Sequence, residues 1–328
     1  MDANTPFPQS TSSAGTGWIV AVPLPGGGSG TETISYQYPL KLISPSSRIN
    51  QASALVFLLS YGGGLVGGDV VNLSVNVQPK ARLSLVTQGH TKIFKTTSEE
   101  NATRQSLDVV VGDNGALCLL PDPVQPFEGS AYVQTQVFKV TSTSTLCLLD
   151  WVSQGRKARG EDWSFLSWTG RNEVWLVDAD KPDSHRLLIR DTQKLSQSAC
   201  DSLGQSLKEN MHILGVFGTL ILWGNALQTL ATFFLDEFAA LPRLGGRDFR
   251  SLEDRAGHND DANDWRSQRI RLEREHGVIW SAAQVRGCVV VKFGSTAVEG
   301  GRAWLSSMLL QEGTVADIFG DQALLCIH

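Results

Sequence analysis

The hydrophobic pattern between residues 32 and 180 predicts a long series of β-strands. Leu73, Val75 and Val77 alternate with polar residues and therefore share one face of a strand, and Leu83 and Leu85 share a face of the next. The same reasoning places further strands at residues 18–22, 107–111, 116–120, 145–152 and 173–177, and around Val133, Thr135 and Val137.

Two local features indicate how these strands are arranged. Residues 112–115 (GDNG) are typical of a turn, because Asn and Gly tolerate a positive φ, and the strands on either side are expected to meet across it. The segments ALCLLPD (116–122) and TLCLLDW (145–151) are alike, as expected of successive rungs in a stack of strands. We therefore predict a mainly β fold with a stacked-sheet, β-helix-like body and a few α-helices.

Helical patterns appear in the second half of the chain. An apolar stripe runs along residues 227–238, and Pro242 ends that helix. Helical spacing is also present at 196–210, whereas residues 243–276 are dominated by Arg, Asp and Glu and fit either a charged surface helix or a mobile loop. The chain closes with a predicted strand, strand and helix at 278–285, 288–293 and 297–310.

The domain organisation follows from these elements. Residues 1–17 are rich in Ser, Thr, Pro and Gly and predict a disordered tail. We expect one domain over residues 18–328, with a charged mobile insertion at about 243–276.

Composition narrows the classes of partner. The net charge is −5, which argues against nucleic acid and against an anionic membrane, because both attract basic proteins. The longest apolar run, near residues 213–223, is interrupted by glycine and is too short to span a bilayer. The first residues lack the pattern of a signal peptide. We therefore expect a cytoplasmic protein.

The cysteines do not indicate a disulfide framework. There are five of them, and no CxxC spacing occurs. Cys118 and Cys147 lie inside apolar runs, so we interpret both as small buried hydrophobic residues.

The run YGGGLVGGD at residues 61–69 is the most unusual segment. A phosphate-binding loop needs a Lys followed by Ser or Thr after its last glycine. Asp69 stands at that position instead, and a strand pattern follows rather than a helix. We therefore interpret the run as a turn between strands or as a place where two backbones approach closely.

Candidate chemistry rests first on acids beside glycine, proline or a strand end. These are Asp69, Asp122, Glu128, Asp150 and Glu161. In a β-rich body such positions gather at one rim. Paired acids there could serve glycoside hydrolysis, offer oxygen ligands to a cation, or cap turns.

Two further segments carry possible site residues. His90 lies in TQGHTKIFK (87–95) with no second His or Cys at metal-binding spacing, which favours an exposed loop histidine. Arg156 lies in DWVSQGRKARGE (150–161), which fits either a salt-bridged surface turn or a docking or channel-lining loop. The sequence contains no His-Glu-x-x-His zinc motif and no Gly-x-Ser-x-Gly nucleophile motif.

The order of these segments resembles one family. PLKLISP (39–45), YGGGLVGGD (61–69), TQGHTKIFK (87–95), LPDPVQPFEGSAY (120–132) and DWVSQGRKARGE (150–161) together resemble the urease accessory protein D family, UreD, also called UreH. The similarity covers about residues 36–180, and the closing strand, strand and helix look similar too. The tail, the 23–30 loop and the 243–276 segment depart from the family pattern and favour a eukaryotic, fungal-type variant.

The resemblance implies a non-catalytic scaffold. Such a protein would bridge apo-urease to the accessory protein F, which recruits the GTPase G, and would form part of a water-filled passage that delivers nickel to urease. It would bind no cofactor tightly, and Ni(II) would only be in transit. By this analogy the candidate passage residues are Asp69, His90, Asp122, Glu128 and Glu161. Arg156 would hold neighbouring acids in place.

Two other functions remain open. A β-helical carbohydrate-active enzyme would need two acids about 5 to 10 Å apart in a groove. It would also need aromatic platforms, for which Trp151, Trp163 and Trp168 are candidates. A pure interaction scaffold without metal contact could present the apolar helix at 227–238 to a partner, although packing in the core is the commoner role of such a helix.

Overall fold

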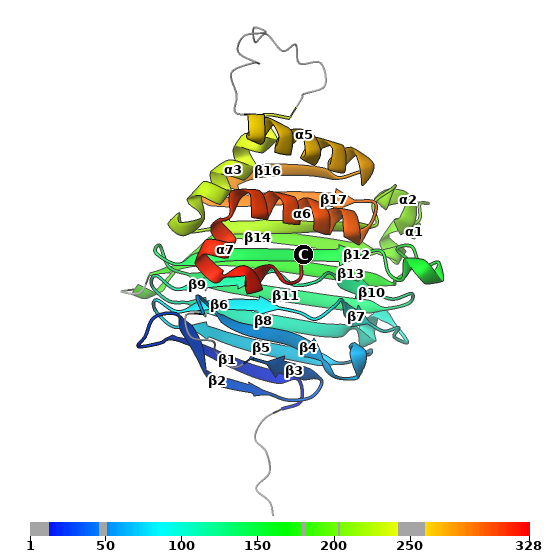
Figure 1. Ribbon diagram of the computed structural model, residues 1–328. Coiled ribbons are helices and arrows are strands. Elements are labelled where there is room, and N and C mark those ends of the chain that lie inside the picture. Colours follow the sequence, from blue (N-terminus) through cyan, green and yellow to red (C-terminus); the bar gives the residue numbers. More distant parts are fainter. Residues whose placement is uncertain (1–12, 46–50, 179–180, 203, 242–259) are drawn as a thin grey trace, which may run out of the picture.

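Two β-sheets face each other, and helices cover the outer side of the larger one (Figure 1). The computed structural model describes residues 13–45, 51–178, 181–202, 204–241 and 260–328. The predicted mainly β, stacked-sheet body with a few helices is confirmed.

The smaller sheet has seven strands in the described residues. Their spatial order is β14 (Lys181–Ser196), β13 (Ser167–Asp178), β11 (Ala131–Val140), β8 (Thr103–Val111), β5 (Val70–Val77), β1 (Thr16–Pro23) and β2 (Ser29–Tyr36). β1 begins at Thr16, so residues 16 and 17, which were expected in the tail, belong to a strand. Residues 1–12 lie outside the described residues.

The larger sheet has ten strands in the same part of the chain. Its main order is β16 (Ile279–Val285), β17 (Cys288–Ser295), β15 (Val216–Trp223), β12 (Thr145–Ser153), β9 (Ala116–Leu119), β6 (Arg82–Val86), β4 (Ala54–Ser60) and β3 (Leu40–Ile43). Two short strands complete it: β10 (Val124–Pro126) pairs with β12 and with β7 (Thr91–Ile93).

The central strands alternate between the two sheets along the chain. In the smaller sheet β5, β8, β11 and β13 are parallel neighbours. In the larger sheet β4, β6, β9 and β12 are parallel neighbours. The chain therefore winds as a flattened coil, with one strand in each sheet per turn. The two similar segments are successive rungs of this coil, with Cys118 directly opposite Cys147, as predicted.

The turn at residues 112–115 is present, but the strands that it joins do not pair. Gly115 N donates to Gly112 O at 2.9 Å, and Asn114 has a φ of 56°. β8 belongs to the smaller sheet and β9 to the larger. The prediction that the strands meet across the turn was therefore right about the turn and wrong about the pairing, because each strand pairs with the strands of the rungs before and after it.

The two edges of the coil differ in the length of their connections. The chain passes from the smaller to the larger sheet through short turns at 78–81, 112–115 and 141–144. It returns through long connections at 61–69, 87–102, 120–130 and 154–166, two of which include the short strands β7 and β10. We call this side the long-loop edge. Four of the five segments that carry the family resemblance lie there.

Two large hydrophobic cores hold the layers together in the described part of the chain. The first lies between the sheets and includes the predicted inward faces of residues 73–77 and 83–85. The second lies between the larger sheet and the helices and includes Cys118 and Cys147. All nine residues of β12 are buried, because both faces of this strand are covered.

The predicted helices are present, with one change. α3 (Gln228–Ala239) and the closing β16, β17 and α6 (Val298–Glu312) agree with the sequence, and α7 (Thr314–Phe319) follows α6. The region 196–210 contains two short helices instead of one, α1 (Gln197–Asp201) and α2 (Leu207–Met211). The apolar residues Leu230 and Phe234 of α3 are buried in the second core. This helix therefore packs in the core and does not present its stripe to a partner.

The charged segment 243–276 is helical where the structure describes it. α5 (Asp260–Glu275) accounts for its second part, and residues 243–259 lie outside the described residues. For residues 260–275 the prediction of a mobile insertion is therefore corrected to a charged helix that packs against α6 (Figure 1).

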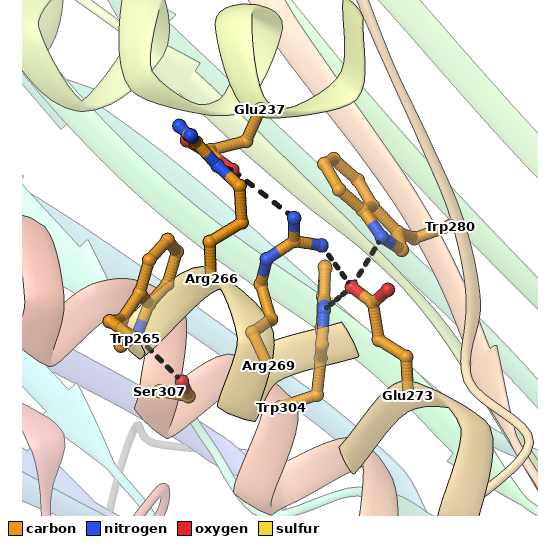
Figure 2. A network of polar contacts seen from close by, with 8 residues as sticks. All are labelled: Glu237, Trp265, Arg266, Arg269, Glu273, Trp280, Trp304 and Ser307. Atoms are coloured by element: carbon orange, nitrogen blue, oxygen red, sulfur yellow. Dashed lines mark hydrogen bonds and ion pairs between the residues drawn. The ribbon is translucent and has the colours of Figure 1, made fainter. Parts of the chain in front are cut away.

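Buried ion pairs fix α5 to its neighbours (Figure 2). The Arg269 side chain is 1% exposed, its Nη2 lies 3.1 Å from Oε2 of Glu237 on α3, and its Nη1 contacts Glu273. Glu273 Oε1 also accepts hydrogen bonds from the indole N–H groups of Trp280 (2.8 Å) and Trp304 (3.0 Å). Because these buried charges have partners, a helix with few apolar residues can pack against the protein.

Candidate functional site

The long-loop edge carries all six residues that the sequence analysis assigns to the passage. They are distributed over its four loops: Asp69 in the first, His90 in the second, Asp122 and Glu128 in the third, and Arg156 and Glu161 in the fourth. This agrees with the expectation that acids beside turns gather at one rim. Their individual surroundings nevertheless differ strongly.

A cavity of about 400 Å³ opens between the two sheets at this edge. His90 and Asp122 line it, together with Gly63 and Leu65 of the glycine-rich run. Its other polar lining residues include Thr87, Gln105, Gln134, Gln136, Asp150 and Arg302. Of the six predicted residues, only His90 and Asp122 are among the described residues that line this cavity.

Asp122 is buried and held by several donors. Its Oδ2 accepts hydrogen bonds from Thr87 Oγ1 at 3.0 Å and from Gly89 N at 2.8 Å. Its Oδ1 lies 2.8 Å from Nη2 of Arg302, a residue of α6. The carboxylate is therefore fixed in the cavity wall with its charge paired.

His90 is half-buried, and not the exposed loop histidine that the sequence favours. Burial lowers its pKa, and the positive charge of Arg302 acts in the same direction, whereas Asp122 and a hydrogen bond with Gln125 oppose the shift. The imidazole is therefore mainly neutral at pH 7. A neutral imidazole can act as a metal ligand.

Asp150 is the acid that the sequence analysis left out of the passage set, although it lines the cavity. It lies within β12 and not in a turn. Its oxygens accept hydrogen bonds from Gln134 Nε2 at 2.9 Å and from Asn172 Nδ2 at 2.6 Å. Burial raises its pKa, and the two hydrogen bonds only partly oppose this. The inner part of the cavity is therefore polar and includes a third carboxyl group.

The buried glutamines of β11 were also missed, for a simple reason. The alternating pattern indicated Val133, Thr135 and Val137, but these residues lie on the less buried face of the strand. The opposite face buries Gln134 and Gln136, followed by Phe138 and Val140. Two amide side chains on the same strand face as two buried apolar residues are a signal that could have located the polar cavity from the sequence.

Glu161 and Arg156 form a separate cluster in the fourth loop. Arg156 N donates to Glu161 Oε2 at 2.8 Å and Arg156 Nε donates to Oε1 at 2.9 Å. The guanidinium lies 3.7 Å above the ring centre of Phe127. Burial alone would raise the pKa of Glu161, but the hydrogen bonds from Arg156 outweigh it and hold the pKa below its usual value. The neighbouring Glu128 is exposed.

Asp69 stabilises the glycine-rich loop. Its Oδ2 accepts a hydrogen bond from Val66 N at 2.9 Å, as in other turns closed by an aspartate. Gly62, Gly63 and Gly68 have φ values of 70°, 78° and 87°, which favour glycine.

The same loop packs closely against the second loop. A Cβ on Gly64 would lie 2.8 Å from Lys92 O, and a Cβ on Gly67 would lie 2.6 Å from Thr96 Oγ1. The run is thus both a turn and a place of close backbone approach, as the sequence analysis expected.

The surroundings of the tryptophans argue against a carbohydrate-active enzyme. Trp151, Trp163 and Trp168 are each 1% exposed and therefore offer no platform for a sugar. The indole N–H groups of Trp151 and Trp163 are hydrogen-bonded to backbone carbonyls. All three are core residues.

No group of three or more His, Cys, Asp or Glu side chains in the described part of the chain could hold a metal ion. No helix described here is long and apolar enough to cross a membrane.

Comparison with known proteins decides the family. The model of the UreD urease accessory protein family matches residues 20–324. This chain belongs to the UreD family. The resemblance seen in five segments of the sequence is thereby confirmed and extends over most of the chain.

Several UreD relatives match along most of their length. An uncharacterized ureD-like urease accessory protein of Schizosaccharomyces pombe is 33% identical over 282 residues, which is 86% of this chain and 89% of the relative. Urease accessory protein 4 of Cryptococcus neoformans var. grubii is 30% identical over 85% of each chain. The urease accessory protein UreD of an Anaeromyxobacter species is 30% identical over 86% of this chain and 80% of its own.

Membership of the UreD family gives the broad function. The protein is an accessory factor with a role in urease maturation, and it is not a catalytic enzyme. The alternative of a glycoside hydrolase is therefore wrong.

Proposed function

We propose that this UreD-family protein is a scaffold that bridges apo-urease to the F and G accessory proteins, and that its inter-sheet cavity forms part of the nickel delivery passage. The observation that carries the metal part of the proposal is the cavity at the long-loop edge, with His90 and Asp122 in its wall. The family assignment supports the role in urease maturation. The assembly would be cytoplasmic, as expected from the sequence.

The donor set of the cavity suits a cation in transit. Imidazole and carboxylate groups are both accepted by first-row divalent metals such as nickel. His90, Asp122 and Asp150 all line the cavity, but they do not form a closed three-ligand group. Weak, incomplete coordination favours release, which a delivery route requires.

The remaining predicted residues lie outside the cavity. Asp69, Glu128 and Glu161 lie in loops of the same edge but do not line the described cavity. We assign them to the approach to the cavity or to the surface that meets a partner. Arg156 would fix the shape of this region through Glu161.

Reconstitution tests the proposal. Apo-urease, the F and G proteins and this chain are co-expressed in the presence of nickel. Urea hydrolysis is then measured with the wild type, with D122N and with H90A. Both variants should lower activation clearly while co-purification with the partners is retained, because each removes a cavity ligand. E100Q, which changes an exposed carboxylate of the same edge that is not among the proposed passage residues, is the matched control and should activate like the wild type.

The outcomes separate the possible functions. Full activation without this chain would disprove the maturation role. Normal activation by both D122N and H90A would remove the passage and leave a pure scaffold. Loss of co-purification in either variant would show that the cavity residues act on assembly and not on nickel transit.

A further inference from the structure

Arg302 links three parts of the chain that are far apart in sequence. It projects from α6 into the wall of the cavity. Its Nη2 lies 2.8 Å from Asp122 Oδ1 in the third loop of the long-loop edge, and its Nη1 donates to the carbonyl oxygen of Cys326 near the C-terminus. The Arg302 side chain is 26% exposed, compared with 7% for that of Asp122. The guanidinium therefore reaches a buried carboxylate from the more open side.

The contacts of Asp122 leave one oxygen for a cation. Oδ2 already accepts hydrogen bonds from Thr87 and Gly89. Oδ1 faces Arg302, and His90, the residue after Gly89, lines the same cavity as both. A metal ion held by Asp122 Oδ1 and His90 would thus need the position that the guanidinium now takes.

We propose that Arg302 is a competing cation. Its guanidinium occupies the position where a metal ion would bind Asp122 Oδ1, and it keeps the Asp122–His90 cation site closed until a divalent ion displaces it. This inference rests on the proposed nickel passage and names the residue that controls entry. The exchange keeps Asp122 paired, because one cation replaces another on a buried carboxylate that is costly to leave without a partner. An empty protein would then hold metal ions only weakly.

Nickel binding by the purified chain tests this inference. Isothermal titration calorimetry with NiCl₂ should show about tenfold tighter binding to R302Q than to the wild type. The reason is that an adjacent guanidinium changes the ionisation equilibrium of a carboxyl group by an order of magnitude or more. D122N should abolish the gain in the R302Q background. R286Q, which removes an exposed arginine bonded to a surface carbonyl, should bind nickel like the wild type.

A conservative variant protects the test against misfolding. R302K keeps the charge but loses the fork that bridges Asp122 and the Cys326 carbonyl. It should bind nickel more tightly than the wild type and less tightly than R302Q, and thermal unfolding of each variant checks that it is folded. Wild-type affinity in every folded Arg302 variant would overturn the inference, as would a gain that persists in R302Q/D122N.

Failure of this inference can be told apart from failure of the passage itself. If D122N impairs urease activation but the Arg302 variants bind nickel like the wild type, only the role of Arg302 is wrong. If D122N and H90A both activate urease normally, the passage is wrong, whatever the affinity of the Arg302 variants.

Discussion

Glu161 and Asp150 are two buried carboxyl groups whose surroundings shift their pKa in opposite directions. Hydrogen bonds from Arg156 overcome the effect of burial on Glu161 and lower its pKa. For Asp150 burial dominates, and hydrogen bonds from Asn172 and Gln134 do not restore the usual pKa. Position in the fold, rather than residue type, therefore decides which acid is firmly ionised.

The lowered pKa of Glu161 predicts a pH-dependent contribution to stability. A carboxyl group with a lower pKa in the folded state contributes stability that is fully present above its unfolded pKa, usually 4.5, and is lost as the pH falls through the folded value. The difference in free energy of unfolding between wild type and E161Q should therefore be largest near pH 7 and shrink below about pH 4.5.

Urea denaturation at a series of pH values measures this difference. E128Q, in the neighbouring loop, changes an exposed side chain and should alter the free energy of unfolding by no more than about 0.5 kcal/mol. A wild-type advantage over E161Q that stays constant from pH 7 to pH 3 would contradict the assigned cause.

At this scale the sequence predicts where the acids lie better than what they touch. Glycine and proline neighbours correctly place Asp69, Asp122 and Glu161 in loops, because those residues mark turns. Contacts such as that of Asp122 with Arg302 join positions 180 residues apart. They depend on how α6 packs, which no local pattern reveals.

Elements of the chain were predictable where one periodicity dominates. The stripe of α3 and the alternation in β5 both appear in the structure. Strand partners were harder to predict, because adjacent apolar segments such as β8 and β9 can join different sheets. α5 was ambiguous, since ion pairs to Glu237 replace much of the apolar surface that usually anchors a helix.

The ion-pair network of Figure 2 predicts that R269M destabilises α5 locally. This change leaves the buried Glu237 and the half-buried Glu273 with fewer partners, and breaking a buried pair typically costs about 3 kcal/mol or more. Urea denaturation should show that loss, and hydrogen exchange should rise first in the amides of α5.

The matched control lies on the same helix. Arg271 is exposed, so R271M should change stability by no more than about 0.5 kcal/mol. Equal stability of R269M and R271M would mean that the buried pairs do not hold α5 in place.

On the scale of the whole molecule, the two edges of the flattened coil differ. Short turns close one edge, and the long connections of the other carry the cavity and the predicted site residues. The stacked body could be predicted from the likeness of residues 116–122 and 145–151. The cavity could not, because it is formed jointly by the two sheets and by Arg302 of a distant helix.

Insertions should affect the two edges differently. Four residues, Gly-Ser-Gly-Ser, placed after the exposed Ser142 in a short turn should leave urease activation near the wild-type level, since lengthening a surface loop costs little. The same insertion after Gln88 beside the cavity should reduce activation to near the level without this chain.

Thermal unfolding must show that both insertion variants are folded. Activation by the two variants is then compared in the co-expression assay with nickel. Equal activation would contradict the functional difference between the edges.

The alternation of strands between the sheets also bears on how such a protein can vary. Each long loop leaves the larger sheet and enters the smaller one, so its two ends are anchored in one strand of each sheet. A loop taken from a relative could therefore be exchanged one rung at a time on a constant framework. Because adjacent loops also contact one another, as Gly64 does Lys92 and as β7 pairs with β10, such an exchange must keep the contacts with the next rung.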